Sequence, residues 1–103
     1  MSAIVIIAYP RSPELKFDYN HYLSKHMPLC NKKWASYGLQ SWDVMEGTED
    51  SPYFVMCITR WPSIQAFETA MKDVGQELVA DVPNYTNAAL TIIKGGVKET
   101  WSA

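Results

Sequence analysis

The sequence predicts an α+β fold of the ferredoxin-like type, in which two helices cover one face of a four-stranded antiparallel sheet. The first observation is the order of the expected elements, strand, helix, strand, strand, helix, strand, which is the split βαβ pattern. The second is size: 103 residues, 48% of them apolar, suffice for one core, so residues 1–103 form a single domain. The third is that the expected strands are apolar on both faces, so the face opposite the helices needs a cover.

A second copy of the chain is the simplest cover for that face. Two identical sheets packed face to face bury both apolar surfaces in one isologous interface. We therefore expect a homodimer through the sheet faces.

The first strand and the first helix are marked by their ends. A β-branched run over residues 3–9 stops at Pro10 and predicts a strand covered on both faces. Asp18 is a good N-cap for a helix that extends to about Tyr37, and Gly38 suits the left-handed residue that ends a helix.

A hairpin follows this helix. Residues 39–46 alternate only in part and predict a strand that is apolar on both faces. Residues 47–52 form a polar turn cluster, and residues 53–61 have a strong strand composition. The two strands should pair in antiparallel fashion.

The last third of the chain predicts a helix and a strand. Ser63 is the N-cap of an amphipathic helix that Gly75 should end, with a short helical turn over residues 76–81. Residues 82–87 are expected to form an irregular connection, and residues 89–97 the fourth strand.

Charge and cysteine usage exclude several classes of function. The formal charge is −2 and the nine basic residues are scattered, so we expect neither a nucleic-acid partner nor a membrane surface. The apolar run over residues 3–8 is too short to cross a bilayer, so a soluble, cytoplasmic protein is expected. Cys30 and Cys57 belong to no metal-binding pattern and should be buried, reduced thiols.

The first helix carries a titratable group on its apolar stripe, and that group is His26. Residues at intervals of three and four share one face of this helix: Tyr19, Tyr22, Leu23, His26, Met27, Cys30 and Trp34. Pro28 should kink the helix and free the carbonyl of Ser24 to hold one nitrogen of His26. His21 falls off the stripe and is expected in water.

Each candidate catalytic residue has a structural alternative. A buried, neutral His26 could exchange a proton near neutral pH, or it could be a core histidine satisfied by a backbone carbonyl. Tyr22, one turn earlier, could donate a hydrogen bond to a substrate oxygen, or it could simply pack its ring in the core.

The candidate substrate pocket is aromatic. Asp43 could orient an imidazole, or it could face solvent or pair with Arg60 on the next strand. Aromatic side chains at strand and helix spacing could wall a pocket or build the core. The aromatic pocket candidates are Trp42, Tyr53, Trp61, Phe67 and Tyr85.

Three segments resemble the EthD family, named for ethyl tert-butyl ether degradation, of the dimeric α+β barrel superfamily. They are the motif Phe17-Asp18-x-x-x-Tyr22-x-x-x-His26-Met27-Pro28-Leu29, the pair Gly38-Leu39, and the run Asp81-Val82-Pro83-Asn84-Tyr85-Thr86-Asn87. Ala88-Ala89 departs from the proline expected after that run. The resemblance implies a small dimeric barrel without a cofactor, with a pocket between helices and sheet.

Two functions from different classes follow. One is an enzyme that acts on a small hydrophobic oxygenated compound in oxidative degradation or secondary metabolism, by cofactor-free acid/base or oxidoreductase-type chemistry with His26 in the pocket. The alternative is a non-catalytic accessory or binding protein that supports an oxygenase. Haem chemistry is a third option, with one pocket histidine and no further ligand in its favour.

Overall fold

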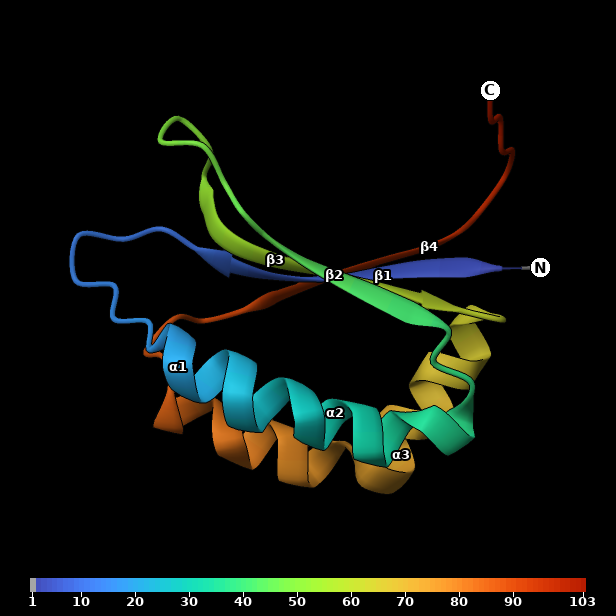
Figure 1. Cartoon of the computed structure of the whole chain (residues 1–103), viewed down its shortest axis with the longest axis horizontal. Helices are drawn as coiled ribbons and strands as arrows, with labels where there is room; N and C mark the ends of the chain where they lie inside the picture. The colour runs from blue at the N-terminus through green and yellow to red at the C-terminus, as the bar shows by residue number, and fades with distance from the viewer. Residues whose placement is uncertain (1) are drawn as a thin grey trace.

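Two layers make up the computed structural model, which describes residues 2–103 (Figure 1). One is a four-stranded sheet and the other consists of two antiparallel helical segments that both lie on the same face of it. The elements are β1 (Ala3–Pro10), α1 (Tyr19–His21), the π-helical turn η1 (Tyr22–His26), α2 (Met27–Trp34), the 3₁₀ turn η2 (Ala35–Tyr37), β2 (Ser41–Glu46), β3 (Tyr53–Trp61), α3 (Ile64–Asp81), the 3₁₀ turn η3 (Val82–Asn84) and β4 (Thr91–Gly96).

The sheet has the strand order β2-β3-β1-β4, and every neighbouring pair is antiparallel. Ile6 of β1 pairs with Ile58 of β3 on one side and with Ile93 of β4 on the other. Each helical segment thus connects an edge strand to a central one, which is the split βαβ topology. The ferredoxin-like α+β fold predicted from the sequence is confirmed.

Helices cover only one of the two faces of the sheet, although both faces carry mainly apolar side chains. Val5 of β1 and Val55 of β3 are fully buried beneath the helices. The opposite face, here called the open face, is only partly shielded and carries Arg60 and Asp43 among apolar side chains. The apolar residues of the open face include Ile4, Ile6, Met56, Ile58 and Ile93.

The first helical segment begins and ends as predicted. The Asp18 carboxylate accepts a hydrogen bond from the backbone N–H of His21 and caps α1. Gly38 has φ of 105°, the left-handed conformation that ends the segment. At Pro28, which has no N–H, the helix accommodates the missing donor with the π-helical turn η1 just before it.

The second helix is longer than predicted. The prediction that Gly75 ends it is wrong, because α3 runs through this residue to Asp81. Phe67 and Leu78 are both buried, so the apolar stripe continues on either side of the glycine. That packing outweighs the roughly 1 kcal/mol that a glycine costs inside a helix.

Two strands start two residues later than expected: β2 begins at Ser41 and β4 at Thr91. Within residues 2–103, no helix has both the length and the hydropathy needed to span a bilayer.

Candidate functional site

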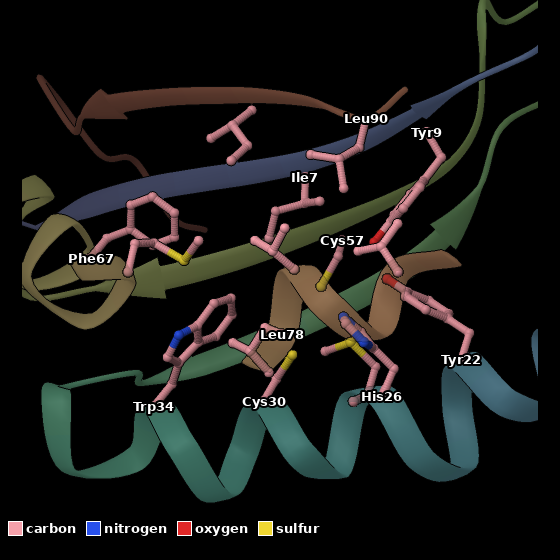
Figure 2. A pocket seen from close by; sticks show the side chains of 15 residues that line it. Ile7, Tyr9, Tyr22, His26, Cys30, Trp34, Cys57, Phe67, Leu78 and Leu90 are labelled. Atoms are coloured by element: carbon pink, nitrogen blue, oxygen red, sulfur yellow. The ribbon is translucent and has the colours of Figure 1, made fainter. Parts of the chain in front are cut away.

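A cavity lies between the helix-covered face of the sheet and the two helical segments (Figure 2). Its free volume is about 60 Å³, and its walls are mainly aliphatic, aromatic and sulfur-containing side chains. Val79 of α3 and Ile92 of β4 line it and are 60% and 41% exposed, so the cavity opens to solvent between these two elements.

The volume limits what the cavity holds in this form. A single water needs roughly 10–15 Å³ measured in this way, and a cavity of about 150 Å³ holds benzene. The cavity therefore accommodates a few atoms as it stands, and a larger ligand requires side chains of the wall to move.

His26 brings a basic nitrogen to this apolar wall. The residue is 6% exposed, and its ring has Nδ1 2.9 Å from Asp81 Oδ2 and Nε2 3.3 Å from the Tyr85 hydroxyl. Because a carboxylate only accepts hydrogen bonds, the hydrogen lies on Nδ1 and Nε2 keeps its lone pair. Burial lowers the pKa of His26 below its ordinary value, although Asp81 acts in the opposite direction. The imidazole is neutral at neutral pH.

Asp81, the last residue of α3, is the hub of the polar groups around His26. Its carboxylate accepts from three donors: His26, His21 Nε2 at 3.0 Å, and Asn84 Nδ2 at 3.0 Å. Burial alone would raise the pKa of Asp81, but the hydrogen bonds from Asn84, His26 and His21 outweigh it and lower the pKa to about 2. Asp81 is therefore ionised at neutral pH.

Three tyrosine hydroxyls complete the polar end of the cavity. Tyr9 and Tyr85 share a hydrogen bond of 2.7 Å, whereas the Tyr22 hydroxyl is fully buried without a partner among the described residues. Burial raises the pKa of Tyr9 to about 12 and raises those of Tyr22 and Tyr85 as well. All three are neutral phenols, and Tyr22 has an unused hydrogen-bond donor.

Cys30 and Cys57 also line the cavity, and both are free, buried thiols, as predicted. Burial raises the pKa of Cys30 to about 12 and that of Cys57 to about 11. Neither forms the thiolate that nucleophilic chemistry needs at neutral pH. Among residues 2–103 no group of three or more histidine, cysteine or acidic side chains is arranged to hold a metal ion.

The sequence-predicted pocket residues separate into two groups. Phe67 lines the cavity, and Tyr85 contacts His26 at its polar end. Trp61 is fully buried behind the wall, and its Nε1–H donates to Thr59. Tyr53 lies at the start of β3, opposite Pro10.

The two candidates on β2 lie outside the cavity lining for reasons of strand geometry. Trp42 faces the helices at the sheet edge, where its Nε1–H donates to Asn31 Oδ1 at 2.6 Å. Asp43, the next residue, points to the open face because side chains alternate along a strand. It pairs with Arg60 at 2.9 Å, which was the alternative interpretation of this residue.

Two details of the histidines correct the sequence-based expectation. The ring nitrogens of His26 contact Asp81 and Tyr85 rather than the carbonyl of Ser24. His21, expected in water, is half-buried and bonds to Asp81, whereas Leu23, expected on the apolar stripe, is 48% exposed.

The π-helical turn is the physical reason for this exchange. In an α-helix, residues five apart differ in direction by about 140°. In η1 the Met27 N–H bonds to the Tyr22 carbonyl, five residues back, which brings residues five apart closer to one side of the helix. His21 and His26 are five apart, so both reach Asp81.

Asp81 was missed as a site residue, although it begins the Asp81–Asn87 run that carries the resemblance. That run folds against the start of α1: the Asp18 N–H donates to the Tyr85 carbonyl, and the Thr86 hydroxyl donates to the Lys16 carbonyl. The motif thus places both Asp81 and Tyr85 next to His26.

Comparison with known proteins gives matches in structure only. No family model matches the sequence, and no curated protein matches it. An EthD-like protein from Ralstonia eutropha JMP134 is 25% identical over 98% of this chain and 96% of its own, with a TM-score of 0.87. An ethyl tert-butyl ether degradation (EthD) family protein from Bacillus halodurans C-125 is 24% identical over 94% and 99%, with a TM-score of 0.69.

A more distant match, the cofactor-independent oxygenase SnoaB from Streptomyces nogalater, is 11% identical over 96% and 95%, with a TM-score of 0.66. Fold and site together define a small ferredoxin-like α+β protein with an enclosed histidine between helices and sheet. Within that class the chain is similar in structure to EthD-like proteins, which confirms the resemblance found in its sequence.

Proposed function

We propose that this protein binds a small hydrophobic molecule carrying one or two oxygens, and that His26 exchanges a proton with it without a cofactor. The observation that carries the proposal is the state of His26: Asp81 holds its Nδ1–H, its Nε2 has only a long hydrogen bond from Tyr85, and the residue lines an apolar cavity. The name of one structural neighbour, a cofactor-independent oxygenase, supports an oxygenase-related role of this kind.

The acid/base step follows from these positions. The bond from Tyr85 to Nε2 is long, at 3.3 Å, so a substrate C–H or O–H replaces it at little cost. Nε2 takes the proton, the electron pair stays on the substrate as an enolate or phenolate, and Asp81 stabilises the imidazolium. The Tyr22 hydroxyl, which has no partner in the described part of the chain, donates to the developing oxyanion.

Two variants of His26 test this step on a substrate found by native mass spectrometry of freshly purified protein. A single positioned acid/base group contributes about 10²- to 10⁴-fold in rate. His26→Ala and His26→Asn should both lose that much turnover, and Asn should keep more of the packing. Turnover that survives both changes would contradict the proposal.

A binding role without chemistry is the second candidate, and one observation favours it. Both ring nitrogens of His26 already have partners inside the protein, as a core histidine would. In that case the protein holds a hydrophobic metabolite for an oxygenase. His26→Asn would then change stability or ligand affinity, and the partner oxygenase would turn over as before when supplied with free ligand.

The open face supports a homodimer as the working form. Its apolar side chains lie on three adjacent strands in register, and a contiguous apolar patch of this kind marks an interaction site. Light scattering should give twice the chain mass of 11.7 kDa, and Ile58→Lys should shift the protein to monomers. A wild-type monomer at micromolar concentration would contradict this assembly.

A further inference from the structure

His21 has no part in the acid/base step, yet it contacts both partners of His26. Its Nε2 lies 3.0 Å from Asp81 Oδ1 and 3.1 Å from Oδ2, so one donor is shared between the two carboxylate oxygens. Its ring stacks on Tyr85, with the planes inclined by 21°. The backbone N–H of His21 is held in turn by the Asp18 carboxylate, 3.1 Å away.

The position of Asp81 explains why a second donor is needed. A carboxylate at the C-terminal end of a helix faces the negative end of the helix dipole. Its side chain is also 17% exposed, so water competes for its oxygens. A donor shared between Oδ1 and Oδ2 lies close to the carboxylate plane and resists its rotation, which keeps Oδ2 directed at His26.

We propose that His21 is a positioning residue for His26: by holding the Asp81 carboxylate in place, it keeps the His26 hydrogen on Nδ1 and leaves Nε2 free to accept a proton. The π-helical turn η1 is part of this device, because it brings His21 onto the side of the helix where His26 reaches Asp81. The proposal rests on the proposed function for its purpose, but not for its test.

Without His21, the two ring nitrogens of His26 compete on more equal terms. With only Asn84 left on Oδ1, the Asp81 carboxylate turns more easily and holds Nδ1–H less well. Nε2–H can then instead donate to the Tyr85 hydroxyl oxygen 3.3 Å away. His26 would then populate both tautomers, and only the one with hydrogen on Nδ1 can accept a proton at Nε2.

The nitrogen-15 chemical shifts of the His26 ring report the tautomer directly and need no substrate. At a pH where His26 is neutral, the wild type should show a single tautomer, with hydrogen on Nδ1. His21→Phe keeps a ring against Tyr85 but has no donor, and it should show a mixture. His21→Gln has no ring but carries an amide nitrogen near the position of Nε2, and it should restore the single tautomer.

Two results would overturn the proposal: a single Nδ1–H tautomer in His21→Phe, or a mixture in His21→Gln as large as that in His21→Phe. If His21→Phe does not fold, His21→Asn, whose amide is too short to reach Asp81, gives the same reading. Asp81→Asn serves as the reference for a lost carboxylate. If a substrate later shows that His26 is not catalytic, the proposed function fails while the tautomer result stands.

A different observation points to Gly75 as the residue that sets the width of the cavity. This glycine is buried in the middle of α3, and a Cβ placed there would lie 3.0 Å from Met71 Cε and 3.2 Å from its Sδ. Met71 lines the cavity. The missing side chain therefore leaves room for the Met71 thioether to lie along the helix instead of extending into the cavity.

Gly75→Ala tests this assignment, with phenol as the probe and Met71→Ala as the matched background. In the wild-type background the added methyl should displace the thioether into the cavity and weaken phenol binding about fourfold, which is what one buried methylene is worth. In Met71→Ala the same change should have no effect. Equal effects in both backgrounds, or a crystal structure of Gly75→Ala with Met71 turned toward solvent, would overturn it.

If phenol does not bind the wild type, the proposed ligand class fails. The crystal structure of Gly75→Ala then still decides the role of Gly75 by the position of Met71.

Discussion

The layer between sheet and helices contains two aromatic clusters of opposite character. The tryptophan cluster consists of Trp34, Trp61 and Phe67, whose rings meet edge to face at 5.3 to 6.0 Å. The tyrosine cluster consists of Tyr9, Tyr22 and Tyr85 around His26. Figure 2 shows Trp34 and Phe67 at one end of the cavity and Tyr9, Tyr22 and His26 at the other.

The difference between the clusters lies in their polar atoms. In the tryptophan cluster, the Trp61 Nε1–H donates to Thr59, which donates in turn to the Val5 carbonyl, so this chain ends inside the sheet. In the tyrosine cluster, the hydrogen bonds run from Tyr9 through Tyr85 and His26 to Asp81 at the surface. The polar chain of the tryptophan cluster is therefore internal, whereas that of the tyrosine cluster reaches the surface.

The largest expected effect is on the tryptophan cluster. Trp61 is fully buried, and Trp61→Ala should lower the free energy of unfolding by about 3–5 kcal/mol, because it removes a large side chain and leaves a cavity. Urea denaturation followed by circular dichroism measures this loss. A loss below about 1 kcal/mol would mean that this cluster does not anchor the fold.

The next largest effect is expected at the Thr59 hydroxyl, which joins the tryptophan cluster to the sheet. Thr59→Val keeps the shape but leaves the Trp61 Nε1–H and the Val5 carbonyl without the hydroxyl that joins them, which should cost about 1–3 kcal/mol. Urea denaturation of the variant beside wild type gives the value. Unchanged stability would indicate that water replaces the hydroxyl.

The contribution of the tyrosine cluster and Asp81 to stability should depend on pH. The pKa of Asp81 falls from the ordinary 3.8 to about 2, so its stabilisation is complete above pH 3.8 and is lost as the pH falls toward 2. The pKa of His26 lies below the ordinary 6.5, so the unfolded chain binds the proton first, and stability also falls as the pH drops below 6.5.

Urea midpoints across this pH range should therefore show two acid steps in the wild type. The lower one amounts to about 1–2 kcal/mol after allowance for the solvent around Asp81. Asp81→Asn should lack the lower step, and His26→Asn should lack the upper one. Two unchanged steps in both variants would place the responsible groups elsewhere.

The smallest effect on stability is expected at Tyr22. Its hydroxyl is buried without a partner among residues 2–103, so Tyr22→Phe should leave stability unchanged or raise it by about 1 kcal/mol. Tyr9→Phe is the matched control, since it removes a bonded hydroxyl and should destabilise by a similar amount. If the Tyr22 hydroxyl donates a hydrogen bond to a ligand, phenol should bind Tyr22→Phe more weakly than wild type. Calorimetry compares phenol binding by Tyr22→Phe and by Tyr9→Phe.

The sequence by itself determined the fold and the burial of His26. Element order and two-sided strands predicted the sheet and its uncovered face, and Asp18 and Gly38 marked the ends of the first helical segment correctly. These features are local: they depend on capping groups, backbone freedom and the spacing of apolar residues, all of which are legible along the chain.

Only the tertiary structure decided what surrounds His26. Asp81 is 55 residues away, and it reaches the ring because α3 continues past Gly75 and ends beside η1. His21 joins them because a π-helical turn changes which residues share a side, and regular helical spacing predicted the opposite. Both outcomes depend on packing between segments far apart in the chain, where burial of a helix face outweighs the preference of a single glycine or the regular period of a helix.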